Sequence, residues 1–162
     1  MHIDFLGEHV ELIPQIAAWQ FEEWGRLTPG DTLEKRVAKV ERRSNLDEIP
    51  LTLIALSGTV PVGTVALVES DLPGREDLSP WLANLLVPRE LRGQGIGSAL
   101  VDRAARVAAE LGHRQLHLFA WEHLDFYRRR GWEPLETGEL YGREITLLRA
   151  DVSHHAADEA AG

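Results

Sequence analysis

The sequence predicts a single α/β domain built around a mixed sheet, and three observations carry this prediction. A glycine-rich loop joins an apolar run to an alanine-rich helical pattern. Two short apolar runs flank a Ser-Gly turn, which is typical of a β-hairpin, and the N-terminal third carries two amphipathic helical patterns. Because strand, helix and strand follow one another at the glycine loop, that unit is expected to be parallel and right-handed.

The N-terminal third is expected to be helical. Apolar residues recur at three-to-four spacing over residues 12–24, and Gly25 ends the pattern. Asp31 or Thr32 can cap a second helix, whose apolar positions between residues 33 and 40 share one face.

From residue 51 onward the pattern predicts strands with short connections. In chain order the expected elements are a hairpin of strands 51–56 and 61–68, a polar loop over 69–80, strand 81–87, helix 98–111, strand 114–120, a short helix 122–130 and a final strand pair 132–139 and 143–148. We expect one domain over residues 1–150 and a disordered C-terminal tail over residues 151–162.

Composition narrows the class of protein. The 162 residues are 44% hydrophobic and 27% charged, as in an ordinary soluble protein. The chain has no membrane-length apolar run and no basic, apolar start of a signal peptide, so we expect a cytoplasmic protein without a membrane partner. It contains no cysteine, which excludes disulfides, thiolate metal sites and a cysteine nucleophile.

The charge balance also bears on partners. A formal net charge of -9 argues against a nucleic-acid partner, which would call for a basic face. An acidic protein suits a cationic substrate such as an amine, although solubility explains the charge about as well. Whether the protein is a monomer or a homodimer is left open by the sequence.

Residues 92–98, Arg-Gly-Gln-Gly-Ile-Gly-Ser, are typical of a phosphate-binding loop. A glycine loop between a strand and a helix leaves several backbone N–H groups and the positive end of the helix dipole facing one place. The dinucleotide pattern G-x-G-x-x-G fails because its third position falls on Ser98, and the Walker pattern fails because no lysine follows the glycines. An empty strand–helix turn is the alternative without a ligand.

Two motifs together resemble the GNAT superfamily of acetyl-CoA-dependent N-acetyltransferases. The loop fits R-x-x-G-x-G through Arg92, Gly95 and Gly97, and about 30 residues later Phe126-Tyr127-Arg128-Arg129-Arg130-Gly131-Trp132 fits a second pattern of the superfamily. The strings Glu23-Trp24-Gly25, Ile49-Pro50-Leu51-Thr52-Leu53 and Leu78-Ser79-Pro80-Trp81-Leu82-Ala83 are similar to a bacterial branch. The resemblance spans roughly residues 1–150.

This resemblance implies a mostly antiparallel central sheet with a parallel, splayed pair at strands four and five, flanked by helices. It implies acetyl-CoA as co-substrate and a direct attack by an amine in a ternary complex. The implied cofactor-binding residues are the strand end Leu85, Leu86 and Val87, which would bind the pantetheine arm and polarise the thioester carbonyl, and the pyrophosphate loop Arg92, Gly93, Gln94, Gly95, Ile96, Gly97 and Ser98. Tyr127 would protonate the departing CoA thiolate, and the alternative is a tyrosine that only packs in the core.

The acceptor is the part that the sequence leaves open. The fourth strand lacks the carboxylate that some relatives use as general base, so the candidates for that role are Glu69, Asp71, Glu76 and Asp77. Glu23, Trp24, Asp71 and Asn84 are the candidates for the acceptor site of a small-molecule or protein amine, and no metal site is expected. The alternative functions are a non-catalytic CoA-binding regulatory module and an interaction domain with an empty loop.

Overall fold

A computed structural model of the protein describes residues 1–155. Its seven strands form one mixed sheet in the order β1-β2-β3-β4-β5-β7-β6. The strands are β1 (His2–Phe5), β2 (Leu51–Ser57), β3 (Val60–Val68), β4 (Trp81–Leu86), β5 (Gln115–Ala120), β6 (Glu133–Leu140) and β7 (Arg143–Asp151). The α-helices are α1 (Ile13–Trp24), α2 (Leu33–Arg42), α3 (Ile96–Glu110) and α4 (Leu124–Arg128), and none of the helices in the described part is long and apolar enough to cross a membrane.

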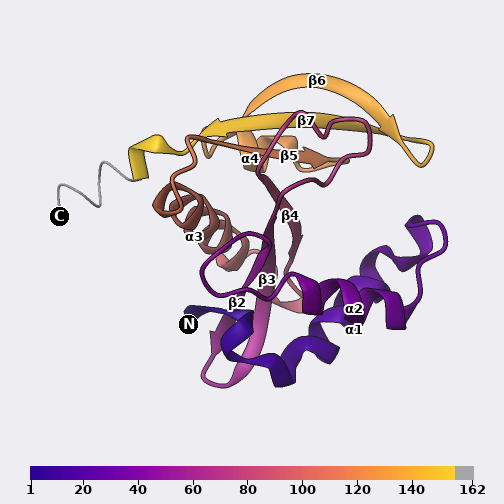
Figure 1. The fold of residues 1–162 in the computed structure, drawn as a ribbon, viewed down its shortest axis with the longest axis vertical. Helices are drawn as coiled ribbons and strands as arrows, with labels where there is room; N and C mark the ends of the chain where they lie inside the picture. The colour runs from indigo at the N-terminus through magenta and orange to yellow at the C-terminus, as the bar shows by residue number, and fades with distance from the viewer. Residues whose placement is uncertain (156–162) are drawn as a thin grey trace.

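The strand pairing divides the sheet into two halves. Every neighbouring pair is antiparallel except β4 and β5, which run parallel and share one bridge, between Trp81 and His117. Beyond that bridge the two strands diverge, and Figure 1 shows β4 leaving the half that contains β5, β6 and β7. The mixed sheet and its parallel pair confirm the fold class predicted from the sequence.

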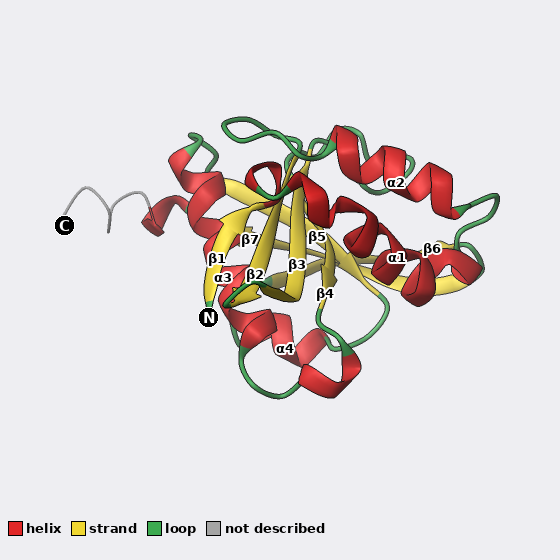
Figure 2. Cartoon of the chain, turned by 90° about the horizontal axis from the view of Figure 1, so that it is seen from below, coloured by secondary structure: helices red, strands yellow, loops and turns green. Residues whose placement is uncertain are grey.

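Helices cover both faces of the sheet, and alternation along β2 shows why. Leu51, Leu53 and Ala55 pack into the core beneath α3, whereas Ile54 and Leu56 point the other way, into the core formed with α1 and α2. Side chains of a strand alternate between faces, so an uninterrupted apolar strand indicates burial on both sides. Figure 2 shows α1 and α2 on one face and α3 on the other.

The structure changes several predicted boundaries. The strand β1 was not expected, because four residues are too few to show alternation, and it lies at the edge of the sheet beside β2. The helix after the glycine loop begins at Ile96 rather than at residue 98, because Gly95 takes the N-cap position. Of the two predicted caps, Thr32 is used: its Oγ1 accepts a hydrogen bond from the Lys35 N–H at 3.1 Å.

The tail predicted to be disordered from residue 151 begins with ordered structure, which corrects that boundary. Asp151 pairs with Gln115 in the sheet, and the N–H of Val152 donates to the Arg114 carbonyl at 2.9 Å. The Val152 side chain is buried in the main core because it fits beneath α3. Residues 156–162 lie outside the described residues.

Candidate active site

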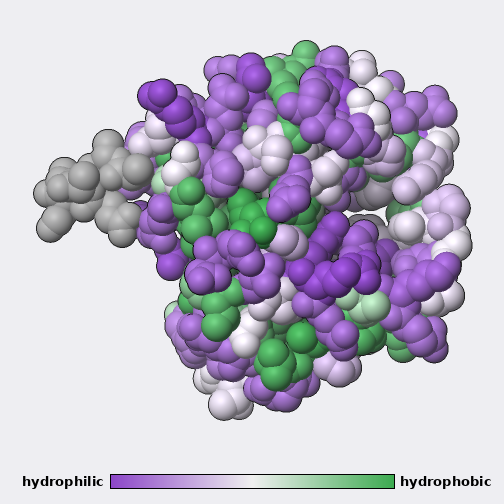
Figure 3. Space-filling view, in the orientation of Figure 1, coloured by the Kyte–Doolittle hydropathy of each residue, from purple (hydrophilic) through white to green (hydrophobic). Residues whose placement is uncertain are grey.

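A cavity of about 760 Å³ opens where β4 and β5 diverge. Its wall combines the C-terminal half of β4, the glycine loop, the first turn of α3, the end of β5 with the segment after it, the C-terminal end of α1 and the middle of α2. The surface view has an opening between the part that carries the β6–β7 hairpin and the part that carries α1 and α2 (Figure 3). Segments far apart in the sequence thus meet around one space.

The glycine loop places free backbone amides at one end of the cavity. Gly93 and Gly95 have φ values of 81° and 86°, and an added Cβ would meet nothing within 4 Å at either position. Glycine is therefore required there by its left-handed backbone and not by crowding. Gly95 caps α3, so the N–H groups of Ile96, Gly97 and Ser98 lack partners within the helix and point toward the cavity end. This end can bind an anion.

A bulge in β4 forms the middle of the cavity. The register between β3 and β4 shifts between Thr64 and Ala66, and Asn84 lies opposite this shift with a φ of 55°. A bulge locally interrupts the ladder and bends the strand. The Asn84 Oδ1 accepts a hydrogen bond from Arg43 Nη1 at 3.0 Å, which fixes the bulged residue to the end of α2.

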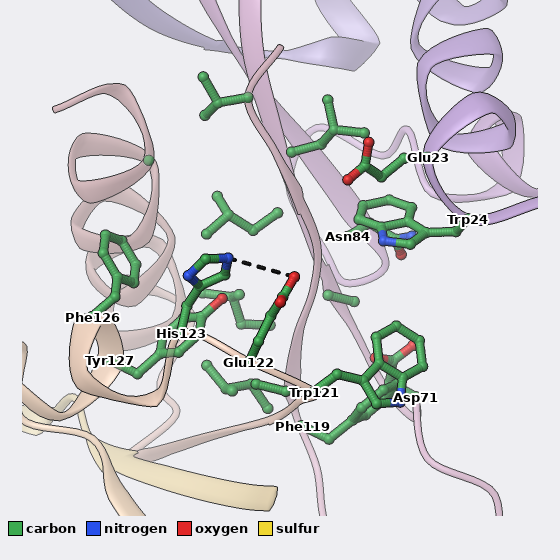
Figure 4. Close-up of a pocket in the computed structure, with 18 of the residues that line it drawn as sticks. Glu23, Trp24, Asp71, Asn84, Phe119, Trp121, Glu122, His123, Phe126 and Tyr127 are labelled. Carbon is green, nitrogen blue, oxygen red and sulfur yellow. Dashed lines mark ion pairs between the residues drawn. The ribbon is translucent and has the colours of Figure 1, made fainter. Parts of the chain in front are cut away.

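Tyr127 lies in α4 on the far side of the cavity from α1. Its ring packs edge-on against Phe126 and Trp132, with centroids 5.1 and 6.2 Å away. Burial raises the pKa of Tyr127 to about 12, so the phenol stays protonated. In Figure 4, Phe126 and Tyr127 lie on the α3 side of the cavity, and Glu23, Trp24 and Asn84 lie on the α1 side.

Two arginines support the end of the cavity that contains the glycine loop. Arg92 Nε donates to the Val87 carbonyl at 2.8 Å, and its Nη2 lies 3.4 Å from Glu23 Oε1. Arg130 Nε donates to Ser98 Oγ at 3.0 Å, and its guanidinium stacks over the Phe126 ring at 3.8 Å. Arg130 therefore ties α4 to the first turn of α3, whereas Arg128 and Arg129 are exposed.

The opposite end of the cavity carries buried charge. Arg36, which is 3% exposed, donates to Asp31 Oδ2 through Nε at 3.1 Å and through Nη2 at 2.5 Å. Burial raises the pKa of Asp71, against the opposing effect of Arg43 and Lys39. Burial lowers the pKa of Lys39, and the neighbouring Arg43 and Arg36 lower it further.

The structure brings nearly all of the predicted site residues together. Every one of them lines the cavity except Gln94: the set is Glu23, Trp24, Asp71, Asn84, Leu85, Leu86, Val87, Arg92, Gly93, Gly95, Ile96, Gly97, Ser98 and Tyr127. Of the four candidate bases, Asp71 alone is among the lining residues. Asp77 is instead paired with Arg75 in the loop, with Nε and Oδ1 3.0 Å apart.

Sequence reasoning missed the charges that α2 brings to the cavity. Arg36 and Lys39 line it, whereas the sequence pattern predicted only an apolar face and a solvated face for this helix. The sequence contained a sign of this: Arg36, Lys39 and Arg43 stand at positions i, i+3 and i+7, a spacing that places three cations on one face of the helix. Glu122 and His123 were also missed; they form an ion pair of 3.6 Å within the cavity wall (Figure 4).

One group of potential metal ligands lies elsewhere in the described chain. Ligand atoms of Asp4, Glu8 and His9 come within 4.8 Å of one another near the N-terminus. The His9 Nε2 is already bonded to Asp4 Oδ2 at 2.8 Å, so a hydrogen bond accounts for the arrangement.

Comparisons with solved structures agree with this architecture. An aminoglycoside 6'-N-acetyltransferase complexed with coenzyme A aligns with a TM-score of 0.75 at 15% identity, over 94% of this chain and 97% of that one. A ribosomal-protein-alanine N-acetyltransferase from Brucella melitensis aligns with a TM-score of 0.72 at 20% identity, over 93% of this chain and 99% of that one. A spermidine N-acetyltransferase chimera from Vibrio cholerae and hSSAT aligns with a TM-score of 0.71 at 13% identity, over 97% of this chain and 99% of that one. At these identities the likeness concerns the fold.

Comparison of the sequence with curated proteins gives no match. The family model described as acetyltransferase (GNAT) domain matches residues 50–134, from the start of the hairpin to the start of β6. This segment is more than half of the chain and contains the glycine loop, the bulged strand and Tyr127. The chain therefore belongs to the GNAT acetyltransferase family, and it is an acyltransferase.

Proposed function

We propose that the protein transfers the acetyl group of acetyl-CoA to a primary amine of a small molecule or protein, by direct attack in a ternary complex. One observation carries this proposal: a single cavity joins the amides at the start of α3, the bulged end of β4 and the Tyr127 side chain. An anion site, an unpaired strand end and a proton donor are the three groups that acyl transfer from CoA requires.

The donor would lie along the α3 side of the cavity. Backbone amides over Gly93–Ser98 would bind the pyrophosphate, since phosphate at a helix N-terminus meets both free N–H groups and the helix dipole. The pantetheine arm would pair with Leu85, Leu86 and Val87 in place of a strand, with one of their amides polarising the thioester carbonyl. The Arg92 side chain is bonded to Val87 and Glu23, so its contribution would be to hold the loop.

The reaction can be written with these groups. The neutral amine attacks the thioester carbon, a C–N bond forms, and the C–S bond breaks as the tetrahedral intermediate collapses. The ammonium nitrogen loses one proton, and the sulfur gains one from the Tyr127 hydroxyl, which later recovers a proton from the solvent. The products are the acetamide and CoA thiol. Holding the amine and the thioester in the correct orientation supplies a large part of the rate acceleration, since well-oriented reacting groups reach effective molarities of about 10⁵ M or more.

Burial defines what Tyr127 can do. A phenol with a pKa of about 12 is a weaker acid than a thiol in water, whose pKa is about 8.5. The same desolvation acts on the leaving thiolate and makes it a stronger base inside the cavity. We therefore assign Tyr127 as the donor that protonates the thiolate as it forms.

Asp71 is the group that we assign to the amine. It lines the acceptor end of the cavity, and burial raises the pKa of its carboxyl, which makes its carboxylate a better proton acceptor. Asp71 can therefore bind the incoming ammonium and take the proton that must leave before the neutral amine attacks. The proton that the nitrogen loses after the attack passes to the solvent.

Tyr127→Phe tests the assignment. At saturating acetyl-CoA and amine we expect kcat to fall about 100-fold or more, the size of a general acid contribution, with the Kd of CoA within a few-fold of the wild type. In the wild type, kcat should show no fall near pH 10, where an ordinary tyrosine ionises, because the pKa of Tyr127 is about 12. An unchanged kcat in the variant would refute the acid role, and a wild type that neither binds CoA nor releases it with any amine would refute the function.

A further inference from the structure

We propose that the acceptor is a small amine that also carries an oxyanion, such as a carboxylate, with Lys39 binding the oxyanion and Asp71 binding the amino group. This inference rests on the proposed function, whose acceptor class it specifies. It depends on which charges at the acceptor end are already neutralised within the protein and which are not.

The cations of α2 differ in what they contact. Arg36 is buried and bonded twice to Asp31, so its charge is matched. Arg43 donates to Asn84, a neutral side chain, and is not among the residues that line the cavity. Lys39 lines the cavity, and within residues 1–155 no carboxylate oxygen lies within 4.0 Å of its ammonium. Lys39 is therefore the cation that a bound molecule can reach.

Carboxylates around the cavity divide in the same way. Glu23 lies 3.4 Å from Arg92, and Glu122 lies 3.6 Å from His123, so both have partners. Asp71 lines the cavity without a cationic nitrogen within 4.0 Å in the described part of the chain. Lys39 and Asp71 nevertheless influence each other electrostatically, which places them in the same region.

Lys39 and Asp71 line one cavity, and neither forms an ion pair within the described residues, so a molecule with both charges can supply a direct contact to each. Burying either charge without a partner is unfavourable, and a zwitterion would supply a partner to each. Arg43 and Arg36 each act on Lys39 more strongly than the opposing Asp71 and Asp31, so the surrounding charge leaves a positive potential at Lys39 and favours this orientation. An oxyanion is the group that this potential attracts.

The same charges disfavour polycationic acceptors. A molecule with several ammonium groups that placed one of them at Asp71 would bring another toward Lys39. Like charges brought together in a site of low dielectric repel strongly.

Paired acceptors test the proposal directly. CoA release is measured with ω-amino carboxylic acids of increasing length, their phosphonate analogues, their carboxamides, and diamines of the same length, with rates corrected for the fraction of neutral amine. The wild type should prefer an oxyanion-bearing amine over its carboxamide by about 10-fold or more in kcat/KM. The carboxylate and phosphonate arms identify which oxyanion the site takes.

Variants of α2 assign the preference to one residue. Lys39→Gln should raise KM for the amino acids and abolish the preference for oxyanion-bearing amines over carboxamides. Lys39→Glu should make the enzyme prefer the diamines. Lys35→Gln is the matched control, because Lys35 is the other lysine of the chain and is exposed, with its Nζ bonded to the Gly30 carbonyl at 2.8 Å. Lys35→Gln should keep the wild-type preference, and the Kd of CoA checks that each variant folds.

The outcomes separate this inference from the proposed function. Rapid acetylation of carboxamides or diamines, or a preference that survives in Lys39→Gln, would overturn the inference and leave the acetyltransferase function intact. Absence of CoA binding and of CoA release with every amine would overturn both.

Discussion

Asp71 is a carboxylate that the fold makes unusually basic by placing it next to a cavity. The raised pKa comes first from burial, and Arg43 and Lys39 reduce the effect without cancelling it. A carboxyl group of this kind gives up its proton later as pH rises, so activity that depends on the carboxylate should rise with pH through a value above 3.8. Asp71 lies three residues after the end of β3, in the loop that brings it to the cavity wall.

Asp71→Asn should therefore lower kcat/KM for the amine by about 100-fold, the lower limit for a general base. It should also remove any rise with pH that remains after the rates are corrected for the fraction of neutral amine. Steady-state kinetics from pH 5 to 9 measure both effects. Asp77→Asn is the matched control, because Asp77 belongs to the same loop but is paired with Arg75 outside the cavity wall. If Asp71→Asn and Asp77→Asn gave the same kinetics, Asp71 would have no role with the amine.

At the scale of single residues, the sequence predicted the donor end better than the acceptor end. Glycines and Tyr127 belong to local motifs whose spacing is fixed by the turn or helix that contains them. Lys39 and Asp71 come from separate elements, and only the packing of α2 against the loop after β3 brings their charges together. No spacing along the chain encodes that approach.

Among the elements, the start of α3 depends on one backbone conformation. Gly95 takes a φ of 86° at the N-cap, a conformation that costs an L-residue about 1–2 kcal/mol. The free amides of the first turn follow directly from it, so the anion site and the stability of the helix start share one residue.

Gly95→Ala should lower the free energy of unfolding by about 1 kcal/mol and also weaken CoA binding, because the loop would relax away from its left-handed conformation. Gly112→Ala provides the comparison: Gly112 follows the other end of α3 with a φ of 94°, and an added Cβ there also meets nothing within 4 Å. It should lose similar stability and keep its affinity for CoA. Urea unfolding and CoA titration measure the two quantities, and equal CoA affinity in both variants would contradict the role of Gly95.

The predicted elements were accurate where their signals are periodic or marked by caps. The amphipathic pattern over residues 12–24 ends at Gly25 in both the sequence and the structure, and the hairpin of β2 and β3 turns at the predicted Ser-Gly. The strand β1 is four residues long and pairs only with β2, so tertiary pairing and not local pattern creates it. Val152 extends the order past β7 for the same reason, through burial against the core.

Across the whole molecule, two half-sheets meet at one bridge. His117 forms that bridge with Trp81, and its Nδ1 lies 3.0 Å from the Pro80 carbonyl. Its side chain is 2% exposed, and burial lowers its pKa although the hydrogen bond to Pro80 opposes this effect. The imidazole therefore remains neutral in the folded protein at a pH at which it would be charged in the unfolded chain.

Stability should consequently depend on pH through His117. Above pH 6.5 the imidazole is neutral in both the folded and the unfolded protein, so His117 does not make stability depend on pH. Below pH 6.5 the unfolded chain binds a proton before the folded protein does, so the free energy of unfolding falls as pH falls. The slope attributable to one such proton is at most about 1.4 kcal/mol per pH unit. His117→Gln, which keeps a donor for Pro80, should give a flatter dependence in urea unfolding between pH 5 and 7.5. An identical slope in the variant would show that His117 is not the group responsible.

The end of β4 is a strand edge, but one that lies inside the molecule. An unpaired strand edge on an outer surface is a template on which other chains can aggregate. Here the edge over residues 84–87 lines a cavity to which helices of both sheet faces also contribute, so it is recessed within the molecule and does not lie on an outer surface. A narrow, extended molecule is the kind of ligand that suits such a recess. The divergence of β4 and β5 thus produces an unpaired strand edge in a recess, where a bound molecule and not a neighbouring chain is its natural partner.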